Sequence, residues 1–229
     1  MSLNILNKMS EANNNPDRVS LKDRYELVIN ARNFHYENFN KWLTYFYVAI
    51  AAIFVAYYNV LAKENELDDS QAIEFLIILL GYVVSILWYW SAKGYYYWNI
   101  HFITMVNHYE KDLLNFNERK RVYFAFANKE NQNDFIHPIR GANISTSKVA
   151  ILFAFIISVF WGILLFEKGI TYFYDCPQCK VIVVWFSIFL SPFSVIFFSW
   201  IFPKKFLSSD TSRMPDLHIE HPKWVDKTE

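Results

Sequence analysis

Four long apolar segments constrain this chain more strongly than any other feature of its sequence. They lie at 42–62, 73–91, 149–166 and 181–202. A helix needs roughly 20 residues to cross the hydrocarbon core of a bilayer, so each segment is long enough to span it. The chain is also 54% hydrophobic and 20% aromatic, which is not the composition of a soluble enzyme. We therefore predict an all-α polytopic membrane protein with four transmembrane helices.

The distribution of basic residues predicts the orientation of these spans. Lys and Arg number six before residue 42, eight in 93–148 and five after 203, against one in 63–72 and two in 168–180. Cytoplasmic segments of membrane proteins carry the excess of Lys and Arg. We therefore expect a protein of the bacterial inner (cell) membrane whose N- and C-termini and long middle region are cytoplasmic.

Helix-start signals divide the rest of the chain. Ser20 and Asp23 have the spacing of a capping box, and Ser145, Thr146 and Ser147 precede the third span as N-cap residues. The predicted parts are a flexible N-terminal arm (1–19), a cytoplasmic helix (20–41), a first transmembrane hairpin (42–92), a cytoplasmic helical region (93–148), a second transmembrane hairpin (149–203) and a cytoplasmic tail (204–229). Pro192 lies inside the fourth span and predicts a kink there.

An amphipathic helix is predicted directly after the second span. Trp and Tyr residues surround Lys93, as expected where a helix leaves the hydrocarbon. Beyond this collar, apolar residues recur at spacings of three and four. They are Tyr95, Trp98, Phe102, Val106, Tyr109, Leu113 and Phe116. Such a seam packs on another helix of the same subunit or on the same helix of a neighbour. We therefore assign Trp98, Phe102, Val106 and Tyr109 to oligomer or helix packing.

Small residues in the second span predict close packing inside the membrane. Gly81 and Ser85 are four positions apart and share one face of that helix. Packing rather than hydrophobicity drives helix association in lipid, and small residues let helix backbones approach each other. We assign Gly81 and Ser85 to the same packing role.

The cytoplasmic helix before the first span carries a polar interruption in an apolar seam. Arg32 and His35 fall on a helical face that is apolar toward both ends. An unpaired buried charge costs several kcal/mol, so these groups need partners. Glu110, on the other cytoplasmic helix, is the candidate, and we assign Arg32, His35 and Glu110 to gating or coupling. In the alternative, Arg32 extends to water or to lipid phosphate just below the membrane.

No pattern in the sequence predicts catalysis. The chain has no glycine-rich phosphate loop, no nucleophile elbow, no metal-ligand cluster of strong spacing and no concentrated basic patch for nucleic acid. Cys176 and Cys179 lie in the second external loop, where a structural disulfide is favoured over a redox pair or half a zinc site. We predict no enzyme activity, no metal or other cofactor and no direct nucleic-acid partner.

A further pattern joins the first two spans to the helices on either side. Arg32 lies on a helix that leads through Phe39 and Trp42 into a span, and a short loop and a second span follow. The helix beyond carries Lys93, Gly94, Tyr97, Trp98 and Glu110. This pattern resembles the RipA-type octameric inner-membrane protein family of bacteria. It is similar, more loosely, to the two-span pore-like domains of bacterial antiphage defence systems. His35 stands where the resemblance leads us to expect a Glu.

The resemblance implies a homo-oligomer around a central opening in the inner membrane. For some relatives it implies an accessory role in antiphage defence beside an RNA-targeting CRISPR nuclease. We therefore expect a gated pore or membrane-perturbing component of antiphage defence. Its expected partners are membrane lipid, other copies of the chain in a ring and a cytoplasmic defence effector. The alternative is a non-conducting membrane sensor or anchor that recruits a cytoplasmic effector.

Overall fold

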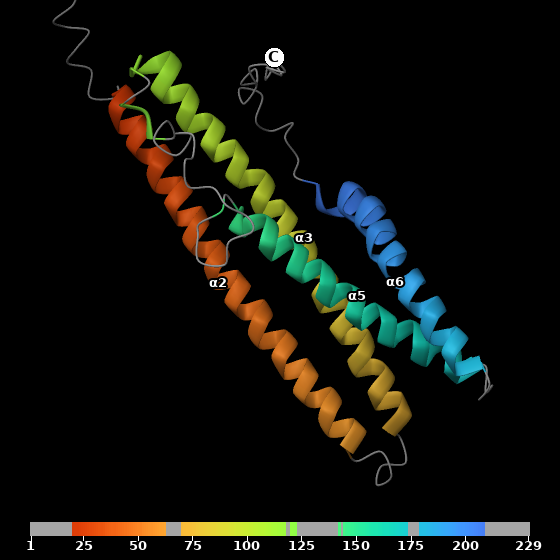
Figure 1. Ribbon diagram of the computed structural model, residues 1–229. Coiled ribbons are helices and arrows are strands. Elements are labelled where there is room, and N and C mark those ends of the chain that lie inside the picture. The colour runs from red at the N-terminus through yellow and green to blue at the C-terminus, as the bar shows by residue number, and fades with distance from the viewer. Residues whose placement is uncertain are drawn as a thin grey trace, which may run out of the picture. The chain divides into compact units, whose positions relative to one another are not determined.

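Four long helices make up the fold (Figure 1). The structure, a computed structural model, describes residues 20–62, 70–117, 120–122, 142, 144–173 and 179–208. The long helices are α2 (Leu21–Ala62), α3 (Ser70–His108), α5 (Thr146–Phe173) and α6 (Lys180–Phe202). Each is long and apolar enough to cross a membrane, and the described residues form no strand. The predicted all-α fold with four spans is confirmed.

The helices α2 and α3 are each about twice as long as a span. α2 has 42 residues and α3 has 39. At 1.5 Å per residue they are about 63 and 58 Å long, whereas the hydrocarbon core is about 30 Å thick. α2 passes residue 41 and α3 passes residue 93 without interruption. The two predicted limits between a cytoplasmic part and a span in this half of the chain, at 41/42 and 92/93, therefore each fall inside a continuous helix.

Local side-chain bonds account for where α2 and α5 begin. The hydroxyl of Ser20 accepts a hydrogen bond from the Asp23 amide, and the Asp23 carboxylate accepts one from the Ser20 amide, both at 3.1 Å. These two bonds confirm the predicted capping box. Before α5, the hydroxyl of Ser145 accepts a bond from the Lys148 amide at 3.4 Å. Pro192 lies within α6, and its predicted kink stays a prediction.

Contacts divide the described residues into two units. The junction unit holds residues within 20–36 and 99–122, and the span unit holds residues within 37–98 and 142–208. α2 and α3 each contribute residues to both units, whereas α5 and α6 belong to the span unit alone. The predicted N-terminal arm, Cys176 and residues 209–229 of the predicted tail lie outside the described residues.

The core of the span unit is built from aromatic rings on three helices. Trp161 of α5 is fully buried, and its ring centroid lies 4.7 Å from that of Phe54 on α2. A Cβ on Gly81 of α3 would lie only 2.5 Å from the Trp161 ring. Phe39 and Tyr95 stack with centroids 3.5 Å apart and an interplanar angle of 6°. Gly81 thus leaves on α3 the space that the indole ring occupies.

Hydroxyl groups and a glycine fit α6 against its neighbours. α5 and α6 pack along each other, and the Ser191 hydroxyl donates to the Val159 carbonyl at 2.7 Å. The hydroxyls of Tyr82 and Ser194 lie 2.7 Å apart and form a second bond between helices. A Cβ at Gly162 would collide with the Ser191 hydroxyl. Small residues permit these close approaches, and the hydroxyls of Ser191 and Ser194 form their bonds at the contacts between helices.

Candidate functional site

The junction unit is organised around one buried charged side chain, that of Glu110. Its residue exposure is 0%. Glu110 lies in a π-helical segment, Tyr109–Leu113, that directly follows α3. Single π-helical turns depart from the regular helical repeat and occur frequently at functional sites. The local departure from α-helix therefore coincides with the buried carboxylate.

Two donors from distant parts of the chain bind the Glu110 carboxylate. The Tyr25 hydroxyl, on the first part of α2, donates to Oε1 at 2.7 Å. The Val122 amide, beyond the end of α3, donates to Oε1 at 3.0 Å and to Oε2 at 3.2 Å. One carboxylate therefore joins α2, the end of α3 and the segment that follows it. We call this arrangement of Tyr25, Glu110 and Val122 the carboxylate clamp.

The backbone after Glu110 turns in a way that supports the clamp. Asn115 has a φ of 50°, a left-handed conformation that Asn tolerates better than most residues. The Phe116 amide then donates to the Glu110 carbonyl at 2.8 Å. The Phe116 ring lies edge-on to the Tyr25 ring, with centroids 6.2 Å apart. The turn thus packs Phe116 beside the same tyrosine whose hydroxyl holds the carboxylate.

The clamp is energetically sensitive because its acceptor is a buried carboxylate. Hydrogen bonds to charged groups contribute about 1.5–3 kcal/mol each, and a buried acceptor left without donors loses its solvation as well. Burial of apolar side chains adds little stability here, because Val106 is the one buried hydrophobic residue among the described residues of the junction unit. A movement that withdraws Tyr25 or Val122 would therefore change the stability of the whole junction unit.

The predicted coupling residues Arg32 and His35 lie near the clamp in sequence but have other partners. The predicted partner of both was Glu110, whereas Glu110 is held by Tyr25 and Val122. Arg32 donates through Nη2 to Asn33 Oδ1 at 2.9 Å. The His35 ring lies against the Phe102 ring, with centroids 5.3 Å apart. The coupling role of Arg32, His35 and Glu110 stays a prediction.

The predicted packing residues occupy different depths. Val106 is fully buried, with 0% of its surface exposed to solvent, whereas Trp98, Phe102 and Tyr109 are partly buried. In the span unit, Ser85 is fully buried and donates its hydroxyl to the Tyr82 carbonyl at 2.8 Å. The partner of Gly81 is Trp161, as described above. Their predicted part in an oligomer interface stays a prediction.

Two partners of the clamp were not identified from the sequence. Tyr25 falls on the apolar face of the predicted first helix, and the signal that it has a polar role is its hydroxyl, since buried tyrosine hydroxyls usually find a hydrogen-bond partner. Val122 binds through its backbone amide, which carries no sequence signal at all. The pairing of Glu110 could therefore be predicted in part from Tyr25 but not from Val122.

The remaining site predictions concern the disulfide between Cys176 and Cys179 and the binding of a metal ion. Cys179 is disulfide-bonded, and the predicted pairing with Cys176 stays a prediction because Cys176 lies outside the described residues. Within the described ranges, no group of three or more His, Cys, Asp or Glu residues is placed to hold a metal ion. The candidate functional site is therefore the carboxylate clamp.

Comparison with known proteins gives one result. A model of the octameric membrane protein family (8xMP) matches residues 22–170, which is more than half of the chain. The matched stretch contains all of α2 except its first residue, all of α3, and the clamp residues Tyr25, Glu110 and Val122. The curated proteins and the solved structures give no match.

Proposed function

The chain belongs to the octameric membrane protein family, and from this premise we propose that it is a gated pore or membrane-perturbing component of bacterial antiphage defence. Self-association and a membrane location follow from the family and from the four spanning helices. The conducting opening and the defence role rest on the resemblance of residues 20–115. The inner membrane and the cytoplasmic termini are supported by the distribution of Lys and Arg.

The carboxylate clamp is the observation that supports gating. Glu110 is fully buried and is satisfied only while Tyr25 and Val122 are both in place. A cytoplasmic partner that binds the segment around Val122 more tightly in its released form would shift the clamp toward that form. The proposed mechanism is a change in helix packing and includes no chemical step.

Helix continuity supports transmission from the clamp to the spans. α2 runs from Leu21, close to Tyr25, to Ala62 without a break, and α3 runs from Ser70 to His108. A helix transmits displacement along its axis because its backbone hydrogen bonds resist compression and bending. A change of packing around Glu110 is therefore expected to reach the membrane through α2 and α3.

Ion flux from liposomes tests this proposal. Purified protein would be reconstituted with an entrapped fluorescent ion indicator, and flux would be compared among wild type, Glu110→Ala and Arg32→Ala. We expect both variants to insert normally and to lose the dependence of flux on the cytoplasmic partner. Glu26→Ala is the matched control, because Glu26 is an exposed carboxylate on α2. Wild-type responses from both variants would contradict the proposed coupling.

A second candidate function is a non-conducting sensor or anchor that recruits a cytoplasmic effector. It is supported by large apolar side chains on α2 that are exposed before the first span, with Leu27 at 62% and Phe34 at 65% exposure. Exposed apolar groups of this kind are typical of protein-binding surfaces. A sealed bilayer in the flux assay, together with loss of effector binding in Leu27→Ser, would favour this function over the pore.

A further inference from the structure

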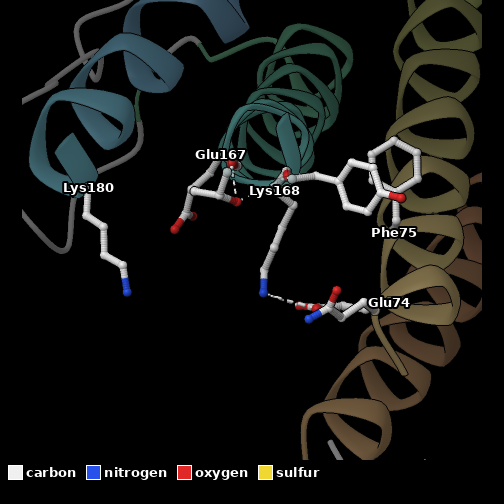
Figure 2. Close-up of a pocket in the computed structure, with 8 residues that line it drawn as sticks. Glu74, Phe75, Glu167, Lys168 and Lys180 are labelled. Atoms are coloured by element: carbon white, nitrogen blue, oxygen red, sulfur yellow. Dashed lines mark hydrogen bonds and ion pairs between the residues drawn. The ribbon is translucent and has the colours of Figure 1, made fainter. Parts of the chain in front are cut away.

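A polar pocket lies in the span unit (Figure 2). It is at the start of α3 and the end of α5, which are the ends of these helices that we predict to face away from the cytoplasm. Its volume is about 350 Å³. The start of α3, the end of α5 and the start of α6 all contribute to its lining. Its charged lining residues are Glu74, Glu167, Lys168 and Lys180. Two acidic and two basic side chains thus share one small space.

One wall of this pocket is a well-formed ion pair. Lys168 Nζ lies 2.8 Å from Glu74 Oε1 and 3.0 Å from Oε2. The Glu74 side chain is 5% exposed and that of Lys168 is 35% exposed. A carboxylate buried to this degree near lipid requires a cation close by, because the unpaired charge would be costly. The pair joins α3 to α5 and leaves the two other charges of the pocket unmatched.

Glu167 and Lys180 supply those two charges from different helices. Figure 2 shows their side chains entering the same open space, Glu167 from α5 and Lys180 from the first residue of α6. Among the described residues neither side chain forms an ion pair. The pocket therefore presents one negative and one positive group, each available to a ligand of opposite charge.

The level of the pocket in the membrane indicates what kind of ligand it meets. Glu74 lies one residue into the predicted second span and Glu167 one residue beyond the predicted third span. Lys180 directly precedes the predicted fourth span. All three therefore lie where hydrocarbon gives way to headgroups. Tyr172, also in the lining, is of the residue type enriched at that level.

We propose that this pocket binds a zwitterionic phospholipid headgroup with a phosphate and a primary ammonium, that of phosphatidylethanolamine. Lys180 binds the phosphate, and Glu167 accepts hydrogen bonds from the ammonium. A primary ammonium has three N–H donors for a carboxylate. Phosphatidylcholine carries no N–H, and phosphatidylglycerol carries no cation. Both are therefore weaker ligands at Glu167.

Native mass spectrometry of the delipidated, detergent-solubilised oligomer tests this proposal. Dioleoyl-phosphatidylethanolamine, -phosphatidylcholine and -phosphatidylglycerol would be titrated into wild type, Glu167→Gln and Lys180→Gln. Both substitutions leave the Glu74–Lys168 pair intact and replace side chains that are not fully buried. The matched controls are Lys205→Gln, just beyond the other end of α6, and Glu26→Gln on α2.

We expect wild type to bind phosphatidylethanolamine about fivefold more tightly than the other two lipids. This is the gain in affinity that one partly exposed ion pair, here between Glu167 and the ammonium, contributes. Lys180→Gln should weaken all three lipids, because all carry the phosphate. Glu167→Gln should remove only the preference for phosphatidylethanolamine. Equal affinity of wild type for the three lipids, or wild-type binding by both pocket variants, would overturn the site. Competition by equimolar soluble glycerophosphoethanolamine would show that the pocket binds the headgroup without its acyl chains, and would overturn the assignment of a lipid as the ligand.

Discussion

The span unit and the junction unit are stabilised in opposite ways. In the span unit, large rings such as Trp161 fill spaces left by small residues such as Gly81. In the junction unit, a single carboxylate, Glu110, receives its bonds from two distant donors. Interdigitated cores resist change because every displacement opens a void or a clash. A hydrogen-bonded clamp instead loses its stabilisation when either donor moves away, without opening a void in a packed core. The comparison therefore favours our proposal that the span unit is the scaffold and the junction unit the part that switches.

The largest effect is expected from removing the central ring of the span unit. Trp161→Ala deletes a fully buried indole and should lower the free energy of unfolding by about 3–5 kcal/mol. Thermal unfolding of the solubilised oligomer, followed by tryptophan fluorescence, measures this loss. Trp200→Ala is the matched control, since Trp200 is 71% exposed on α6. Equal losses from the two variants would refute the assignment of Trp161 to the core.

A smaller effect is expected from filling the space that Trp161 occupies. A Cβ in Gly81→Ala would lie 2.5 Å from the indole, and overpacking of this kind costs about 1–3 kcal/mol. Gly94 lies on the same helix with nothing within 4 Å of its added Cβ. Gly94→Ala should therefore be neutral or stabilise by up to about 1 kcal/mol through helix propensity. The same thermal measurement separates the two substitutions, and a stable Gly81→Ala would contradict the close fit.

The smallest effect on global stability is expected in the junction unit. Tyr25→Phe removes one donor from Glu110 and should cost about 1–3 kcal/mol locally, with little change in unfolding of the span unit. Hydrogen exchange at residues 114–117 and 120–122 should become about fivefold faster or more. Tyr45→Phe, on an exposed tyrosine of α2, serves as control. Unchanged exchange in Tyr25→Phe would show that the clamp does not hold the segment after α3.

The sequence predicts the helices well because membrane crossing is a property of single segments. All four predicted spans lie within observed helices, and the Ser20–Asp23 capping box needs only residues three apart. Contacts between distant segments are different. Periodicity shows that residues such as Val106 face a partner, without identifying that partner. The bonds of Glu110 to Tyr25 and of Lys168 to Glu74 join residues 85 and 94 positions apart.

The sequence pointed to the central residue of the candidate site, Glu110, but not to the groups that donate hydrogen bonds to it. Glu110 was selected as the polar partner that the seam of the first helix requires, and it is buried. Its donors are an uncharged hydroxyl and a backbone amide. The π-helical segment that carries it departs from the regular repeat on which the prediction of the seam depended. An irregular turn followed by a left-handed Asn115 leaves no clear signal in hydrophobic spacing.

The uninterrupted course of α2 makes it a lever for the thickness of the bilayer. Residues 21–41 precede the predicted span and form about 31 Å of continuous helix. A bilayer that thins around a long span is accommodated by tilting the helix. A tilt of about 10° at the membrane surface would displace the start of such a rod sideways by about 5 Å. A change in bilayer thickness would thereby act mechanically on Tyr25, close to the start of α2.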